Sequence, residues 1–194
     1  MCIMEFVDGM MLYYGSYIPL VKNDMDDCMV RRDFGCGLYF VSDELQAESF
    51  IKVSVLQAKG LKLIDNAQNY GYITCCKYHA PNNDIPVYKF KDIDKMWLDF
   101  VALNRRRRLA EILTPLISRE IFNSEIIIGK AVSDVANVYI NAYINDLYGS
   151  IMDEKSSHIP LSLLRREVLV NQYCFLSQRA LDGLELVEVK RYEC

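Results

Sequence analysis

Apolar positions along the chain follow two different spacings, which predicts a mixture of strands and helices. Short apolar or alternating runs predict strands at residues 12–16, 35–41, 72–78, 85–90, 125–128, 168–176 and 184–192. Spacings of three and four residues predict helices at 43–59, 94–113 and 134–148, with helical turns at 160–166 and 177–181. The turn signal Pro81-Asn82-Asn83-Asp84 predicts a hairpin that joins the strands on either side of it.

The three longer helices carry further local signals. Asp43 is a candidate N-cap with Gln46 three residues later, which is the spacing of a capping box. In the helix expected at 94–113, one face presents the residues Trp97, Phe100, Val101 and Asn104. In the helix expected at 134–148, the predicted inward residues are Val135, Val138, Tyr139, Ala142 and Tyr143.

Residues 12–50 combine two of the strands with small-residue turns and a helix start. The first strand ends in Tyr13-Tyr14-Gly15-Ser16, and the second is announced by Asp33-Phe34-Gly35-Cys36-Gly37-Leu38-Tyr39-Phe40. Glycines one residue apart allow the backbone to come close to a ligand or to a neighbouring strand. Tyr39 follows them on the strand, where a flat ring can lie against a planar substrate.

Composition narrows the class of protein. A length of 194 residues predicts one compact domain, residues 1–194, and 52% hydrophobic residues suffice for its core. A net charge of −4 argues against a general binder of polyanions. The chain has seven cysteines but no CxxC pair, so we expect reduced thiols in a cytoplasmic protein, without a metal site or a disulfide framework. No signal peptide and no membrane-spanning run is recognisable.

The motif stretch resembles the NAD-binding half of ADP-ribosyltransferases of the diphtheria-toxin and poly(ADP-ribose) polymerase type. The elements that carry the resemblance are Tyr14-Gly15-Ser16, Phe34 to Phe40, and the late run Asn171-Gln172-Tyr173-Cys174-Phe175. The whole chain is still more similar to an uncharacterised bacterial family assigned to that superfamily. That similarity rests on residues 33–39, Gln46-Ala47, residues 97–101 with Asn104-Arg105, residues 126–129, and residues 171–175.

The resemblance implies a fold and an activity. The fold would be α+β, with two small, mostly antiparallel sheets packed together and helices at the periphery. NAD would be the substrate, no metal would be needed, and one ADP-ribose would pass to an unknown protein or nucleic-acid acceptor with release of nicotinamide. A phage-related or toxin–antitoxin role, with a small partner protein from a neighbouring gene, would also fit such a domain.

The resemblance also implies roles for particular residues. The backbone of Gly15 would grip the nicotinamide amide, with Ser16 orienting the nicotinamide or its ribose. Tyr39 would stack on the ring, and Phe50 would form the other wall. Arg31 or Arg32 would meet the pyrophosphate, because a guanidinium binds phosphate in a bidentate way. Tyr14 and Gln172 would stand in the catalytic positions, and Gly35 and Gly37 would complete the binding strand.

Two departures from the superfamily motifs motivate an alternative function. Tyr14 replaces a histidine, and Gln172 replaces a glutamate. A phenol still donates one hydrogen bond, but an amide brings no negative charge to an oxocarbenium-like transition state. The alternative is therefore a catalytically degraded module that binds NAD, ADP-ribose or a protein on the same fold.

Each candidate site residue also has a purely structural interpretation. Gly35 and Gly37 fit a bulge and a tight turn, Tyr14 and Tyr39 fit core aromatics, and Gln172 fits a satisfied strand amide. The run Arg105 to Arg108 fits either a solvated helix end or a site for an anionic partner. His79 and His158 lie in turn-like stretches, and we expect both at the surface.

Overall fold

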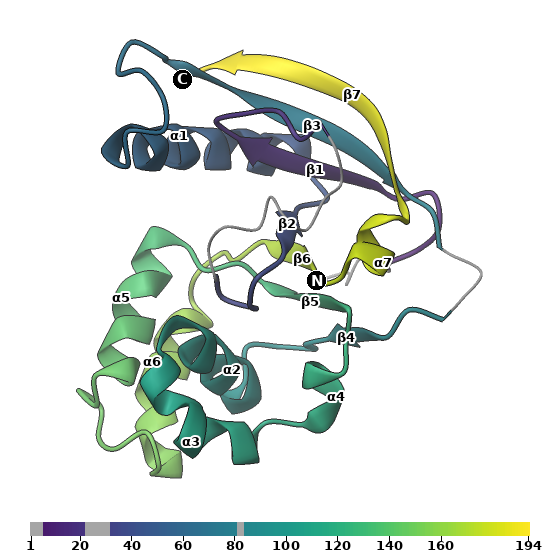
Figure 1. Ribbon diagram of the computed structural model, residues 1–194. Coiled ribbons are helices and arrows are strands. Elements are labelled where there is room, and N and C mark those ends of the chain that lie inside the picture. Colours follow the sequence, from purple (N-terminus) through teal and green to yellow (C-terminus); the bar gives the residue numbers. More distant parts are fainter. Residues whose placement is uncertain (1–5, 22–31, 81–83) are drawn as a thin grey trace. The chain divides into compact units, whose positions relative to one another are not determined.

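The structure is a computed structural model that describes residues 6–21, 32–80 and 84–194 (Figure 1). It is an α+β protein with two small sheets, as expected. The chain divides into two compact units. The first unit comprises residues 1–25, 39–85 and 177–194, and the second comprises residues 26–38 and 86–176.

The first unit is a three-stranded antiparallel sheet with a long helix against it. The strands β1 (Met11–Ser16), β3 (Tyr70–Tyr78) and β7 (Leu184–Glu193) lie in the order β1-β3-β7. Gly15 pairs with Ile73 in the register of β1 and β3, and Ile73 pairs with Lys190 of β7. The helices are α1 (Glu44–Gly60) and the short α7 (Gln178–Leu181).

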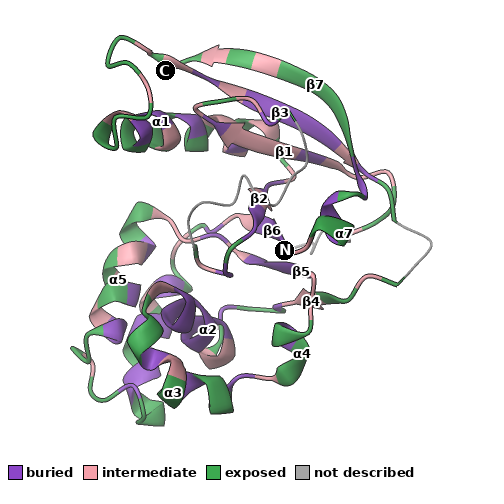
Figure 2. Cartoon of the chain, in the orientation of Figure 1, coloured by how far each residue is buried: buried purple, intermediate pink, exposed green. Residues whose placement is uncertain are grey.

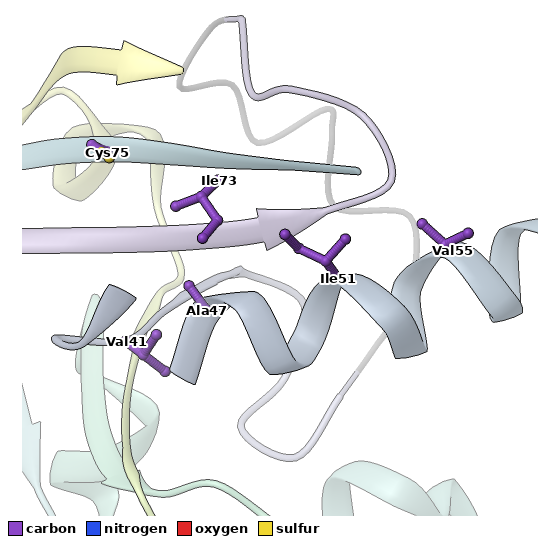
Figure 3. Packing of buried hydrophobic residues seen from close by; sticks show 6 residues of the cluster. All are labelled: Val41, Ala47, Ile51, Val55, Ile73 and Cys75. Atoms are coloured by element: carbon purple, nitrogen blue, oxygen red, sulfur yellow. The ribbon is translucent and has the colours of Figure 1, made fainter. Parts of the chain in front are cut away.

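The core of the first unit lies between α1 and the sheet. Figure 3 shows Ala47, Ile51 and Val55 on the side of α1 that meets Ile73 and Cys75 of β3. These side chains are almost completely buried, whereas the opposite side of α1 is exposed (Figure 2). Apolar burial along one side of the helix therefore fixes it to the sheet.

Polar contacts fix the start of α1. The Asp43 side chain accepts a hydrogen bond from the Leu45 N–H at 2.8 Å, so Asp43 is the N-cap that the sequence predicts. Glu44 Oε1 accepts from Lys190 Nζ at 2.7 Å and from the Tyr192 hydroxyl at 2.6 Å. Hydrogen bonds from Lys190 and Tyr192 lower the pKa of Glu44, and the same contact raises the pKa of Tyr192 to about 12. The first turn of α1 is thus joined to β7.

The second sheet has the strand order β2-β6-β5-β4. Its strands are β2 (Leu38–Phe40), β4 (Val87–Lys89), β5 (Ile126–Lys130) and β6 (Asn171–Phe175). β5 and β6 are antiparallel, whereas β4 and β5 are parallel. Burial of Ile126, Ile127 and Ile128 makes β5 apolar on both faces.

The helices of the second unit pack around α2, which is buried over most of its length. α2 (Lys95–Arg105) is buried from Trp97 to Asn104 (Figure 2). The helical elements that follow are η2 (Arg107–Leu109), α3 (Ala110–Leu113), η3 (Thr114–Leu116), α4 (Arg119–Phe122), α5 (Asp134–Ile144), η4 (Glu154–Ser157) and α6 (His158–Leu164). Rings of Phe34, Phe90 and Phe100 lie 5.8–6.1 Å apart and close the core beside β5.

The predicted hairpin around residues 81–84 is wrong. β4 pairs in parallel with β5 and not with β3. The Pro86 carbonyl accepts backbone hydrogen bonds from Glu125 and Ile126, at 2.9 and 3.2 Å, which sets the parallel register. A turn signal reports only that the chain bends, and the strand that follows joins the sheet where its ladder is completed.

The long helix predicted at 94–113 is also interrupted. α2 ends at Arg105, because Arg106 is extended with φ −137° and ψ 98°, and short helical turns follow. The helix predicted at 134–148 ends earlier, at Ile144. The strand predicted at 35–41 is reduced to Leu38–Phe40, since Gly35 lies in a turn.

The inward face predicted for α5 is only partly correct. Val135 and Val138 are 50% and 64% exposed, while the buried residues are Ala136, Ile140, Tyr143 and Ile144. Both faces of α5 carry apolar residues, so periodicity alone does not choose between them.

A buried polar contact between α2 and α5 determines which face of α5 is buried. The Tyr143 hydroxyl donates to Asp99 Oδ1 at 2.6 Å, and Lys95 Nζ donates to Asp99 Oδ2 at 2.7 Å. Burial, followed by the hydrogen bond to Asp99, raises the pKa of Tyr143. The phenol therefore stays protonated and keeps its role as a donor to a carboxylate that is 4% exposed.

The sequence also led us to expect reduced cysteines and no membrane-spanning segment. Cys75, Cys76, Cys174 and Cys194 are free thiols, whereas Cys36 is disulfide-bonded, which the sequence analysis did not expect. No helix in residues 6–21, 32–80 and 84–194 has the length and apolar character that crossing a membrane requires. Within the same ranges, no group of three His, Cys, Asp or Glu side chains is placed to hold a metal ion.

We expect Tyr143→Phe to lower the free energy of unfolding by about 1–2 kcal/mol, because Asp99 loses one donor while the ring remains packed. The matched control is Tyr139→Phe on the same helix, whose hydroxyl has no hydrogen bond within the described residues. It should change stability by less than about 0.5 kcal/mol. Urea denaturation measures both, and equal effects would contradict the proposed link between α2 and α5.

Candidate functional site

The backbone groups of β1 alternate between the two edges of the strand. The Tyr13 N–H donates to the Val41 carbonyl at 2.8 Å, and the Val41 N–H donates back at 3.0 Å. The Tyr17 N–H donates to Ser54 Oγ on α1 at 3.1 Å. In an antiparallel strand, every second residue directs its N–H and C=O to the same edge. Tyr13 and Gly15 therefore face the edge of β1 that lies away from β3, and Tyr17, directly after the strand, bonds to α1.

Gly15 differs from its two neighbours on this edge. Its N–H and C=O have no hydrogen-bond partner among the described residues. A Cβ atom at Gly15 would lie 2.1 Å from the backbone oxygen of Ala47, which only glycine avoids. The missing side chain lets β1 lie directly against α1. Within the described part of the chain, Gly15 thus offers one donor and one acceptor without partners, a pair that complements a primary carboxamide.

Aromatic side chains stand on both sides of this edge. Tyr39 and Val41 are two residues apart in an extended segment, so their side chains point to the same side. Val41 packs with Ala47 in the α1 cluster, which places Tyr39 on the side of α1. The Tyr14 ring lies on the opposite face, with its centroid 5.7 Å from that of Phe40.

Phe50 lies on the β1 side of α1. Ser54 bonds to β1 through Tyr17, and Phe50 precedes Ser54 by one helical turn on the same stripe. Phe50 is 36% exposed, so its ring is accessible to a ligand and is not part of the core. Ser16 is buried, and its hydroxyl lies 3.4 Å from Ser54 Oγ, so it already has a partner within the fold.

The second glycine motif forms a tight turn in the second unit. The Arg32 N–H donates to the Gly35 carbonyl at 3.0 Å, and the Gly35 N–H donates back at 3.2 Å. Gly35 has φ +116°, and a Cβ atom at Gly37 would lie 2.4 Å from the Phe175 carbonyl oxygen. The backbone conformation at Gly35 and the close packing at Gly37 thus each explain why a glycine occupies the position. Arg32 is exposed, and Arg31 lies outside the described residues.

Arg105 anchors this turn, a role that the sequence analysis missed. Arg105 Nε donates to Asp33 Oδ1 at 2.6 Å, and its guanidinium also donates to Asn137 Oδ1 at 2.5 Å. The expectation of a solvated arginine run is therefore wrong for Arg105, although Arg106, Arg107 and Arg108 are exposed. Burial raises the pKa of Asp33, and the lowering by Arg105 is smaller. The Asp33–Arg105 pair therefore fixes the position of the turn on α2 more than it adds to the free energy of unfolding.

Gln172 is held within its own sheet. It is 8% exposed and pairs with Gly129 in the register of β6 and β5. Its Nε2 donates to the Lys130 carbonyl over a long 3.5 Å. This single long bond places Gln172 in its sheet as a strand residue, but it only partly meets the interpretation of a satisfied strand amide within the described residues.

The predicted site residues fall into two groups. Tyr14, Gly15, Ser16, Tyr39 and Phe50 belong to the first unit. Gly15, Tyr39 and Phe50 lie towards α1, whereas the Tyr14 ring lies on the opposite face and the Ser16 hydroxyl lies against Ser54. The others, Arg32, Gly35, Gly37 and Gln172, belong to the second unit. Two further residues of α1 were not predicted as site residues: Ser54, whose hydroxyl lies against Ser16, and Gln46, which the sequence suggested only as a capping-box and motif residue.

Comparison with known protein families matches residues 10–186 to a family described as a protein of unknown function, DUF3990. This chain belongs to the DUF3990 family. No curated protein and no solved structure matches it. The resemblance to an uncharacterised family is confirmed at that level, and the Gly15 edge lies within the matched residues of the DUF3990 chain.

In this DUF3990 protein, Gly15→Ala should lower the free energy of unfolding by about 1–3 kcal/mol, because the added methyl group collides with the α1 backbone. Gly60→Ala is the matched control, since nothing lies within 4 Å of a Cβ atom there. It should stabilise α1 by about 0.5–1 kcal/mol. Thermal denaturation separates the two, and a neutral Gly15→Ala would show that β1 does not approach α1 this closely.

Proposed function

We propose that this protein is an NAD-dependent mono-ADP-ribosyltransferase that transfers ADP-ribose to a macromolecule and releases nicotinamide. The observation that supports it is that the N–H and C=O of Gly15, on the edge of β1 away from β3, have no hydrogen-bond partner among the described residues. A nicotinamide carboxamide has the complementary acceptor and donor. The contacts that support the proposal all lie in the first unit.

The residues around Gly15 would hold the planar ring. Tyr39 lies on the α1 side of the strand, and Phe50 stands half-exposed on α1. An aromatic side chain that packs against a heteroaromatic ring contributes about 0.5–1.5 kcal/mol beyond the buried area. The amide would set the orientation of the ring, and the aromatics would supply most of the affinity.

Transfer breaks the bond between ribose C1′ and the nicotinamide nitrogen. The bonding electron pair leaves with nicotinamide, which becomes neutral, and positive charge develops on the ribose. An acceptor oxygen or nitrogen then forms its bond to C1′ and gives up a proton to solvent. Groups that favour this developing charge are the main means of catalysis. Chain growth is not expected, because Gln172 lacks the carboxylate that would activate an elongating hydroxyl.

We expect the wild-type protein to bind NAD and release nicotinamide, and Tyr39→Ala to weaken NAD binding about tenfold, or about 1.4 kcal/mol. Calorimetry measures the binding, and chromatography of the same sample measures the release. Tyr139→Ala, in α5 of the second unit, is the control and should bind as the wild type does. NAD consumption that is indifferent to Tyr39→Ala would contradict the site.

A second candidate function is a binding module without turnover. Tyr14 and Gln172 favour it, since neither supplies the imidazole or the carboxylate of the active superfamily members that the chain resembles. Gln172 bonds to a backbone carbonyl within its own sheet, as a structural residue would. NAD binding without nicotinamide release in the same experiment would favour this candidate over the enzyme.

A further inference from the structure

Gln46 carries a buried polar atom that the fold does not use. Its Oε1 is shielded from solvent and has no hydrogen-bond partner in the described part of the chain. The capping box predicted for Asp43 and Gln46 would have engaged this side chain, but among the described residues the helix start is capped by the Leu45 N–H donating to Asp43 Oδ1. A buried acceptor without a donor is unfavourable for the free protein.

The position of Gln46 on α1 follows from two contacts on the same helix. Glu44 bonds to β7, and Ser54 bonds to β1, so the rotation of α1 relative to the strand order β1-β3-β7 is fixed. Successive helical residues differ by about 100° in direction. Going from Glu44 past Ala47 and Ser54 towards the β1 side, the next residues around the helix are Phe50, then Gln57, and then Gln46, which lies about three turns before Gln57 along the helix.

Gln46 therefore lies beyond the open edge of β1 and not over the sheet. Ala47, the next residue, touches Gly15, whose N–H and C=O are also without partners within the described residues. Phe50 stands one turn further along the same stripe. Among the described residues, Gly15 of β1 and Gln46, the neighbour of Ala47 on α1, thus both carry hydrogen-bonding groups without partners, and the exposed ring of Phe50 lies one turn from Gln46.

We infer that Gln46 is a further binding residue, whose Oε1 accepts a hydrogen bond from a hydroxyl or amide donor of NAD held at the Gly15 edge. The inference rests on the proposed function for the identity of the ligand. Its structural part, an acceptor left unsatisfied until ligand binds, stands separately. A purely structural glutamine would have its polar atoms satisfied in the free protein.

Gln46→Met tests both parts, because methionine keeps the length of the side chain and removes the acceptor. We expect its melting temperature without ligand to rise by about 2–4 °C, since a buried unsatisfied atom is gone. We expect its affinity for NAD to fall about tenfold or more. Gln46→Leu serves as a second apolar variant. Gln57→Met, at an exposed position of the same helix, is the control and should change neither quantity.

The outcomes separate the inference from the proposed function. Wild-type affinity for NAD in both Gln46 variants would overturn the inference and leave the proposed function intact. Lower melting temperatures in both variants would also overturn it, because Gln46 would then be satisfied in the free protein. Absence of NAD binding by the wild type would overturn the proposed function, and the assignment of the ligand with it.

Discussion

The close approach of β1 to α1 at Gly15 is the constraint on which the first unit depends. The backbone oxygen of Ala47 occupies the space where any other residue would place a Cβ atom. Burial of Ile51 and Val55 against the sheet, and the bonds from Glu44 to β7 and from Ser54 to β1, hold α1 at this distance. The same approach leaves the Gly15 backbone without partners in the described structure, so packing and the candidate site share one cause.

In the second unit, buried polar contacts inside an apolar core determine how the helices are arranged. Asp99 joins α2 to α5 through Tyr143, and Asp33 joins the glycine turn to Arg105 at the end of α2. Removing one partner of such a contact leaves the other buried and unsatisfied, so these contacts select one arrangement of the helices. They orient the elements, while the aromatic rings and the isoleucines of β5 supply the apolar burial.

A structural feature could be predicted from the sequence where the residues that determine it lie close together along the chain. The strand at Leu12–Ser16, the helix with its Asp43 cap, and the strand at the C-terminus follow from local patterns, and the structure confirms them. The pairing of β4 with β5 and the buried face of α5 depend on contacts distant in sequence, so periodicity could not supply them. At the site, the resemblance of Tyr14-Gly15-Ser16 to a superfamily motif pointed to Gly15, whereas the unsatisfied Gln46 fitted an ordinary capping-box pattern.

The central claim is that the Gly15 backbone is unpaired in the free protein and is paired when ligand binds. Residue-resolved amide hydrogen exchange by NMR, with and without NAD, tests it most directly. In the free protein, the Gly15 amide should exchange faster than those of Tyr14 and Ser16, which face β3. NAD should slow the exchange of Gly15 more than that of its neighbours. A Gly15 amide that is already as protected as Tyr14, and unchanged by NAD, would contradict the account.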